Sequence, residues 1–328
     1  MSVSEVSLSI VVPCRNEADN IPLFLNALEE ESESKFKAHN VSLDVLLVDD
    51  GSTDSTLQVM QEQASSNRSV LVNYISLSRN FGKEAAMYAG LASAKGDYVA
   101  VMDADMQDPP SLLFRMYETV SSGSCDNVAT RRYSRKGEPP IRSFFSKLFY
   151  RVINAISQTE IVDGARDYRL MNRKMVDAIL ELSERNRFSK GIFSWVGFKT
   201  EWISYENIER TEGNSSWSFW SLILYAVDGI AAFSTVPLSM ASVLGLLFCM
   251  IALLTIVFVV VRAALFGDPV AGWPSLICVV LLVGGIQLLC LGVIGQYLAK
   301  TYIEVKRRPL FVVAESSLQD RTNEKRNF

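Results

Sequence analysis

The sequence predicts an α/β domain built on a mostly parallel sheet, followed by two membrane-spanning helices. Short apolar runs typical of buried strands alternate with helical patterns through the first part of the chain, an order that produces a parallel sheet with helices on both faces. Two later segments, 229–261 and 269–299, contain no charged residue. Each exceeds the roughly 20 residues that cross the hydrocarbon core of a bilayer. We therefore expect one domain over 1–232 and a membrane region over 233–300.

The composition argues against several classes of protein. The formal net charge of the 328-residue chain is −4, so a nucleic-acid partner is not expected. The five cysteines form no CxxC pair, and this argues against both a zinc site and a disulfide framework. The single histidine, His39, lies in a polar connection, which excludes a clear histidine-based catalytic triad.

Four strands are expected in the first domain, over 8–12, 43–48, 70–77 and 98–102. In parallel sheets, ligands bind beyond the carboxyl ends of the strands. Three of the four strand ends carry acidic or amide side chains, so we expect the chemistry to gather at one edge of the sheet. These side chains belong to Asn16, Glu17, Asp49, Asp50, Asp103 and Asp105.

Asp103 and Asp105 form an acidic pair directly after a buried strand. Like charges so close together raise each other's pKa unless they share a cation. Mg²⁺ or Mn²⁺ bridging to the oxygens of a diphosphate resolves this conflict. Acidic pairs also occur in many surface loops, but the preceding strand and the following Met106–Pro110 segment favour a metal site here.

The segment Asp49–Asp54 also follows a buried strand. One interpretation is a capped turn, which Gly51 and Ser52 satisfy well. The other places Asp50 against the base or the ribose of a nucleotide. The residues alone leave both interpretations open.

Two segments between the sheet and the membrane region are expected to be interfacial helices. Over about 141–157, apolar residues recur at helical spacing opposite Arg142, Lys147 and Arg151. This pattern is typical of a helix that faces a protein core or of one that lies in the membrane interface. The segment 217–233 carries tryptophan and tyrosine residues suited to an interfacial aromatic belt.

The two membrane spans are expected over about 236–261 and 274–299. A basic cluster at 306–308 follows the second span, and the positive-inside rule places it in the cytoplasm. Two spans return the N-terminal domain to the same side, so we expect a multi-pass protein of the inner membrane with that domain in the cytoplasm. The remaining segment, 301–328, is expected to be a basic cytoplasmic tail, polar and disordered after Val313.

Four polar segments follow one another in the first domain: Val11–Glu17, Val48–Asp54, Ser78–Lys83 and Met102–Pro110. In this order they resemble the signatures of family 2 glycosyltransferases, which have the Rossmann-like GT-A fold. The branch most similar is that of the polyprenyl-phosphate sugar transferases, which includes dolichyl-phosphate mannose synthase and the bactoprenol glucosyltransferases of the GtrB type. The resemblance extends through Asp163–Met171, Arg187–Phe188, Trp217–Trp220 and the two spans, and so covers nearly the whole chain.

The resemblance implies roles for most of these polar residues. The nucleotide-sugar is expected to be bound by Pro13, Asn16, Glu17, Asp50, Lys83 and Asp103. Mg²⁺ or Mn²⁺ is expected at Asp103, Asp105 and Gln107. Phosphate, of the lipid or of the donor, is expected at Arg132, Arg135 and Arg169. Relatives often carry a phosphate-binding lysine where this chain has Ser216. Which residue of this chain makes that phosphate contact is left open.

The resemblance also implies a reaction, the inverting transfer of a sugar onto a polyprenyl phosphate at the cytoplasmic face of the membrane. A lipid phosphate is already anionic at neutral pH, so the enzyme must mainly align it and stabilise the departing nucleoside diphosphate. The expected catalytic residues are Asp105, Asp108 and Asp167, although Asp108 could instead cap the helix after Pro110. UDP-glucose and undecaprenyl phosphate are the favoured substrates.

Other functions are compatible with parts of the sequence. Mannosyl, N-acetylhexosaminyl and aminoarabinosyl transfer to the same lipid class remain open, and a homo-oligomer is compatible with the sequence. A processive polysaccharide synthase would need more spans and a QxxRW motif, which the chain lacks. A lipid flippase would need more spans or polar groups within them. A non-catalytic membrane scaffold would have no need of acidic strand ends.

Overall fold

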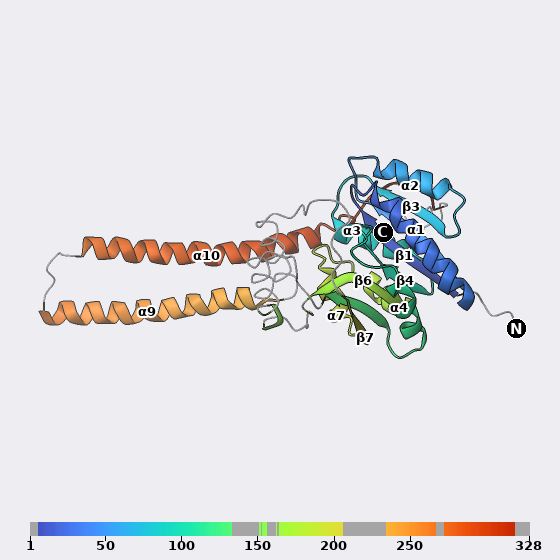
Figure 1. The fold of residues 1–328 in the computed structure, drawn as a ribbon. Coiled ribbons are helices and arrows are strands. Elements are labelled where there is room, and N and C mark those ends of the chain that lie inside the picture. The colour runs from blue at the N-terminus through green and yellow to red at the C-terminus, as the bar shows by residue number, and fades with distance from the viewer. Residues whose placement is uncertain are drawn as a thin grey trace.

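A computed structural model describes residues 6–132, 151, 153–155, 162, 164–205, 234–266 and 272–318. An α/β domain lies at one end, and two long antiparallel helices extend away from it side by side (Figure 1). Several of the expected features lie outside the described residues: the helix at 217–233, most of the helix at 141–157, and the residues Arg135 and Ser216. Within 141–157, residues 151 and 153–155 are helical.

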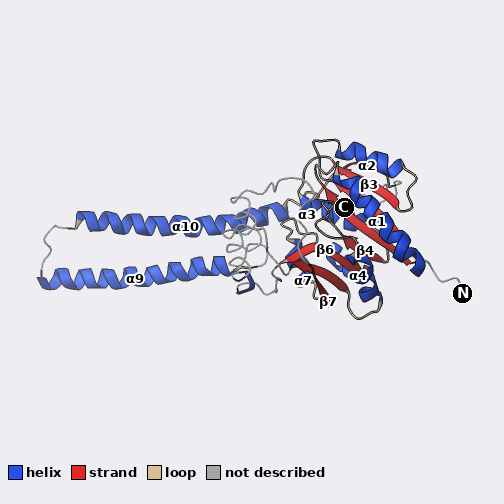
Figure 2. Ribbon diagram, viewed as in Figure 1, coloured by secondary structure: helices blue, strands red, loops and turns tan. Residues whose placement is uncertain are grey.

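The α/β domain is built on one eight-stranded sheet with the order β7-β5-β6-β4-β1-β2-β3-β8 (Figure 2). The four expected strands pair in parallel as β1 (Val6–Cys14), β2 (Val41–Asp49), β3 (Leu71–Leu77) and β4 (Tyr98–Val101). The sheet then continues through β6 (Ala165–Asn172), β5 (Asn127–Arg132) and β7 (Thr200–Tyr205). Because β6 runs antiparallel to both β4 and β5, the sheet is mixed at this side. The mostly parallel sheet predicted from the sequence is confirmed.

Helices cover both faces of the sheet. One face packs against α1 (Asn20–Glu31), α2 (Thr56–Ser65) and α4 (Leu112–Ser121). A short π-helix (Ser32–Phe36) and a 3₁₀ helix (Lys37–His39) lead from α1 into β2. The other face packs against α3 (Lys83–Ser93), α6 (Arg173–Glu181) and α7 (Ser189–Trp195).

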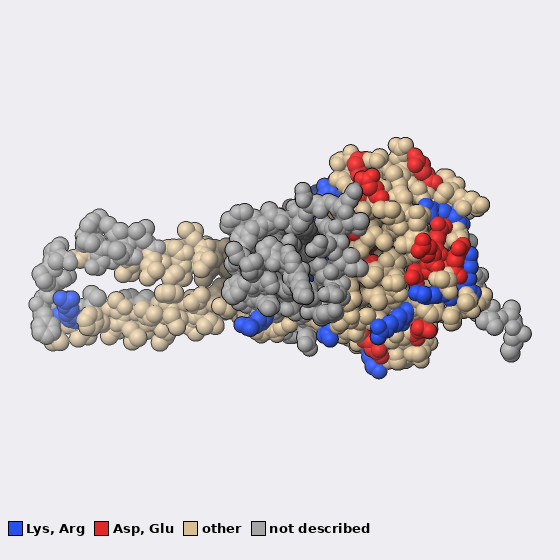
Figure 3. Space-filling view, viewed as in Figure 1, with Lys and Arg blue, Asp and Glu red and all other residues tan. Residues whose placement is uncertain are grey.

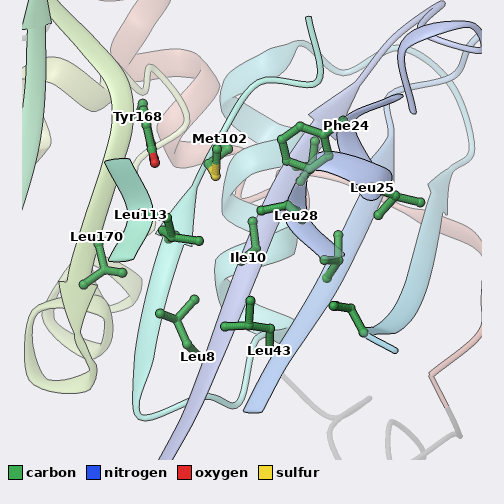
Figure 4. Packing of buried hydrophobic residues seen from close by; sticks show 14 of the residues in the cluster. Leu8, Ile10, Phe24, Leu25, Leu28, Leu43, Met102, Leu113, Tyr168 and Leu170 are labelled. Atoms are coloured by element: carbon green, nitrogen blue, oxygen red, sulfur yellow. The ribbon is translucent and has the colours of Figure 1, made fainter. Parts of the chain in front are cut away.

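The alternation of side chains along β1 divides the core between the two faces. Leu8 and Ile10 are fully buried on the α1 side together with Phe24 and Leu28 (Figure 4). Val11 is fully buried on the α3 side. Burying a side chain of this kind stabilises the fold by about 1.5–3 kcal/mol. The strands are therefore held firmly on both faces, and the loops at their carboxyl ends have a rigid base.

The two long helices are α9 (Val236–Phe266) and α10 (Trp273–Val305), and both are long and apolar enough to cross a membrane. The candidate spans found among the described residues, Val236–Thr255 and Leu282–Val305, have mean hydropathies of 2.3 and 1.7 and are not buried inside the protein. Charged side chains gather on the α/β domain and are sparse along the helices (Figure 3). So much exposed apolar surface is unfavourable in water and suits lipid contact. Both helices run past their expected ends.

The chain after α10 returns to the sheet, and the expected disorder after Val313 is wrong for residues 313–318. β8 (Val313–Ser316) pairs antiparallel with β3. Phe311 and Leu318 pack on the core between the sheet and α3. The hydroxyl of Ser317 accepts a hydrogen bond from the backbone N–H of Tyr74 at 2.8 Å, across 243 residues of sequence. Four residues are too few to show the alternation by which a strand is predicted, and the partner strand is remote in sequence.

Candidate active site

The loop after β1 is held against the loop after β2. Asn16 adopts a left-handed conformation with φ 56°. Its backbone N–H donates to the hydroxyl of Ser52 at 3.0 Å, and its side-chain oxygen accepts from the N–H of Thr53 at 2.9 Å. The N–H of Glu17 donates to the hydroxyl of Thr56 at 2.9 Å. Asn16 and Glu17 therefore have fixed positions at the edge of the sheet, next to Pro13 in β1.

Asp49 and Asp50 have different partners. Asp49 accepts from the N–H of Ser52 at 2.9 Å, which is the capped turn predicted as one interpretation of this segment. Asp50 instead accepts from the N–H of Phe81 at 2.7 Å and of Gly82 at 3.0 Å. Burial raises the pKa of Asp50, while these two amides oppose the rise. Asp50 thus fixes the loop between β3 and α3.

Gly51 directly follows these two carboxylates in the chain, and no other residue fits its position. Its φ is +63°, in the left-handed region. A Cβ atom added there would lie 2.5 Å from the backbone carbon of Arg79 and 2.5 Å from the backbone nitrogen of Asn80. The loop after β2 and the loop after β3 therefore touch through their backbones, and this contact requires glycine.

Lys83 lies between the carboxylates of Asp103 and Asp167 at the centre of the site. Its Nζ lies 2.8 Å from each carboxylate oxygen of Asp103 and 2.7 Å from Oδ2 of Asp167. Partial desolvation opposes the charge of Lys83, but the carboxylates of Asp103 and Asp167 outweigh it and raise its pKa, so the ammonium group stays charged. Burial alone would raise the pKa of Asp167, but Lys83 and Lys190 more than offset this and hold it well below its usual range.

Asp105 and Gln107 lie in the loop that follows β4. The N–H of Gln107 donates to Oδ1 of Asp105 at 3.2 Å, and its side-chain oxygen accepts from Arg166 at 2.9 Å. Within the described part of the chain, no group of three or more His, Cys, Asp or Glu residues could hold a metal ion. Mg²⁺ and Mn²⁺ are commonly bound by one or two carboxylates together with phosphate oxygens and water. Asp103 and Asp105 are two such carboxylates, and the divalent ion expected at them stays a prediction.

Asp108 belongs to the same loop but is only 1% exposed. The hydroxyl of Tyr205 donates to its Oδ1, and the Nε of Arg166 lies 3.3 Å from the same oxygen. Burial raises the pKa of Asp108 to about 6, although Arg166 opposes the rise. The helix-capping interpretation is not observed, because the N-cap of α4 is Ser111 and no side chain caps it. Asp108 instead links β7 to the loop that carries Asp105.

Arg169 is buried behind the site with 2% exposure. Its guanidinium group lies 3.4 Å from the centroid of the Phe193 ring and donates to the backbone oxygen of Arg166 at 3.0 Å. These contacts hold the start of β6, where Asp167 lies. Arg132 is the last residue of β5 and is paired in register with Tyr205. The phosphate contacts expected of both arginines stay predictions.

The geometry agrees with the result of comparing the chain with known protein families. Residues 9–180 match the family described as Glycosyl transferase family 2. This match covers more than half of the chain. The chain belongs to glycosyl transferase family 2.

Relatives of this family 2 glycosyl transferase match it over almost its full length. A glycosyltransferase of Synechocystis sp. is 40% identical over 311 residues, which cover 94% of this chain and 95% of the relative. The prophage-derived bactoprenol glucosyl transferase of Shigella flexneri is 38% identical over 311 residues, covering 95% of this chain and 98% of the relative. The glucosyl-3-phosphoglycerate synthase of Mycobacterium tuberculosis, solved with Mn²⁺, uridine-diphosphate-glucose and phosphoglyceric acid, aligns with a TM-score of 0.46 at 17% identity, over 69% of this chain and 78% of that one.

In this glycosyl transferase the predicted site residues other than the arginines fall into three groups. Lys83, Asp103 and Asp167 are in direct contact. Asp105, Gln107 and Asp108 belong to one loop. Arg166 contacts this loop at the side chains of Gln107 and Asp108. Pro13, Asn16, Glu17 and Asp50 line the neighbouring loops. Sequence reasoning missed Arg166 and Tyr205 as partners of Asp108, and no local pattern marks Tyr205 as part of the site.

Proposed function

We propose that this glycosyl transferase moves glucose from UDP-glucose onto undecaprenyl phosphate at the cytoplasmic face of the inner membrane, with inversion at the anomeric carbon. The observation that carries the proposal is the extent of the similarity to the bactoprenol glucosyl transferase of Shigella flexneri. It covers 95% of this chain and 98% of that protein, so it includes the region of the two apolar helices as well as the α/β domain. An acceptor that is itself a membrane lipid explains why a transferase domain is joined to two such helices.

The charges of the site suit a phosphate acceptor. A phosphate monoester is already anionic, so the reaction requires alignment behind the anomeric carbon more than the removal of a proton. Lys83 is a charged ammonium group at the centre of the site, where it can contact a diphosphate or hold Asp103 and Asp167 in place. A divalent ion at Asp103 and Asp105 would stabilise the charge of the departing nucleoside diphosphate.

The pairing of β8 with β3 supports the proposed topology. β8 follows the second apolar helix and β3 precedes the first, yet both belong to one sheet. Two membrane crossings in succession return the chain to the side from which it started, as this pairing requires. The basic cluster at 306–308 favours the cytoplasm for that side, where nucleotide-sugars are made.

The proposal is tested with purified full-length protein in detergent, undecaprenyl phosphate, and a panel of nucleotide-sugars. The mass of the lipid product identifies the sugar that is transferred. We expect a hexose adduct with UDP-glucose that is lost when a chelator is added. A mannose, N-acetylhexosamine or aminoarabinose adduct would show that the donor is a different nucleotide-sugar, while the proposed lipid acceptor would still stand. Turnover of every donor without any lipid product would contradict the acceptor.

A further inference from the structure

One face of α10 continues from the contact with α9 into the contact with the α/β domain. From Ile286 onward its partly buried residues recur every three or four positions, which places them on one side of the helix. They are Ile286, Cys290, Val293, Tyr297, Lys300 and Glu304. The thiol of Cys290 lies 3.7 Å from the backbone oxygen of Ala241 in α9. The hydroxyl of Tyr297 donates at 2.5 Å to the backbone oxygen of Ser234, just before α9.

The last two turns of this face bind the loop that leads into α7. The carboxylate of Glu304 accepts from the N–H of Arg185 at 2.6 Å and from the N–H of Asn186 at 3.2 Å. The Nζ of Lys300 donates to the side-chain oxygen of Asn186 at 2.9 Å. The end of α10 therefore fixes both the backbone and a side chain of this loop.

The same loop fixes the start of α3. The N–H of Ser189 lies 3.1 Å from both carboxylate oxygens of Glu84, and its hydroxyl donates to the same carboxylate. Glu84 is the neighbour of Lys83, whose ammonium group holds Asp103 and Asp167. A short series of contacts thus leads from Glu304 to the charged centre of the site.

The segment after α10 supports the other side of the α3 start. The backbone oxygen of Val312 accepts from the N–H of Ser78 at 2.8 Å, directly after β3. Phe311 packs on the core beneath α3, and so does Phe81. Phe81 and Gly82 then give their N–H groups to Asp50. Both loops that flank the start of α3 are consequently held by the chain between Lys300 and Leu318.

We propose that the segment 300–318 is a positioning element of the active site and that Glu304 is its principal positioning residue. Glu304 sets the position of the 185–189 loop, which sets Glu84 and therefore the ammonium group of Lys83. α10 is one continuous helix of 33 residues, so its place in the bilayer is transmitted to the site without a flexible joint. The inference rests on the proposed function for its assay, since it assigns Glu304 to the donor side of that reaction.

The test measures steady-state kinetics of full-length Glu304→Ala, Glu304→Gln and Glu304→Asp with UDP-glucose and undecaprenyl phosphate. We expect Glu304→Ala to lower kcat/KM for the donor about tenfold, because small misplacements of catalytic groups have effects of this size or larger. The KM for the lipid should stay within about twofold of its original value, since the substitution does not change the binding of the lipid. Glu304→Gln keeps an acceptor oxygen at the same reach and should restore most of the rate. Glu118→Ala, which removes an exposed carboxylate of α4, is the matched control.

Hydrogen exchange of the same variants separates positioning from a local effect. Faster exchange in both 182–190 and 78–84 supports the proposal, whereas a change confined to 182–190 overturns it. An increase in lipid KM alone also overturns it, because Glu304 would then serve the acceptor. If Glu304→Ala does not fold, the rates of the other two variants are compared. Glu304→Asp, whose side chain is shorter by one methylene, must then be slower than Glu304→Gln. If the unaltered protein transfers no sugar, the proposed function has failed, and the exchange data alone test the inference.

Discussion

The Nζ of Lys83 lies 2.7 Å from Oδ2 of Asp167, across 84 residues of sequence. The antiparallel pairing of β4 with β6 accounts for this contact. Val101 is paired with Arg169, so two residues further along, Asp103 comes opposite Asp167. Two carboxylates so placed repel each other, and Lys83 at the start of α3 offsets that repulsion. The charged centre of the site is therefore assembled from a strand end, a strand start and a helix start.

Replacing Lys83 with Met should lower both stability and activity. The carboxylates of Asp103 and Asp167 would lose their shared cation, but the side chain of Lys83 is 44% exposed and water screens part of the loss. We expect a decrease of about 1–2 kcal/mol in the free energy of unfolding, between the values for exposed and buried ion pairs. Thermal unfolding in detergent measures it, with Lys95→Met at an exposed position as the control. An unchanged melting temperature would show that the ion pairs of Lys83 with Asp103 and Asp167 contribute nothing to the stability of the fold.

Replacing Asp105 with Asn should remove most of the activity and leave the fold intact. Asp105 is partly exposed at the end of β4, and its proposed partners are a metal ion and the donor. We expect kcat/KM to fall by about 100-fold or more, as for the loss of one group that stabilises transition-state charge. The assay is run with saturating Mg²⁺ or Mn²⁺, and Asp19→Asn at an exposed position serves as the control. Near-normal turnover would remove Asp105 from the metal site.

Gly51→Ala should destabilise the protein more than Gly123→Ala. Both glycines have positive φ, +63° and +75°, so both substitutions carry the cost of a left-handed residue, about 1 kcal/mol. Only at Gly51 would the new Cβ meet backbone atoms, at 2.5 Å, while nothing lies within 4 Å of it at Gly123. Chemical denaturation of the two variants should separate them by about 1 kcal/mol or more. Equal losses would mean that the loop after β3 moves aside freely.

Glu84 should make stability depend on pH. Burial raises its pKa above the usual value, and the hydrogen bonds from Ser189 only partly oppose the rise. The folded protein therefore binds this proton more tightly than the unfolded chain. The stabilising contribution is fully present below the unfolded pKa of about 4.3 and is lost as the pH rises through the higher folded pKa. In Glu84→Gln this dependence should disappear, so the difference in melting temperature between the two proteins should change between pH 4.5 and 7. A constant difference would contradict the raised pKa.

The topology can be tested by labelling single cysteines in a protein that lacks the five native ones. Ala271→Cys lies in the connection between α9 and α10, and Arg308→Cys lies in the exposed basic cluster after α10. An impermeant thiol reagent applied to intact cells should label the first and spare the second. Arg308 is exposed, whereas the backbone and hydroxyl of Ser317, further along the chain, are hydrogen-bonded to Tyr74. Labelling of Arg308→Cys in intact cells would reverse the orientation and the proposed route of donor supply.

Local patterns were enough to predict the parallel strands and the residues at their ends. Asp50, Asp103 and Asp105 each follow an apolar run, and the sheet brings such positions to one edge. The partners of these residues were not predictable in the same way. Tyr205 reaches Asp108 from a strand 97 residues later, and the register of β7 decides that contact. Likewise, Asp49 and Asp50 are adjacent in sequence, but only the course of the next loop shows that one closes a turn and the other holds Phe81.

The position of β8 at the edge of the sheet has a consequence for how the protein is made. β3 leaves the ribosome before either apolar helix, and β8 leaves after both. Until β8 arrives, the edge of β3 and the core surface under Phe311 are unpaired. If only one of the two helices crossed the membrane, β8 would lie on the opposite side from β3 and could not pair with it. Completion of the sheet is thus coupled to the arrangement of the two helices, because β8 reaches β3 only when both strands lie on the same side of the membrane.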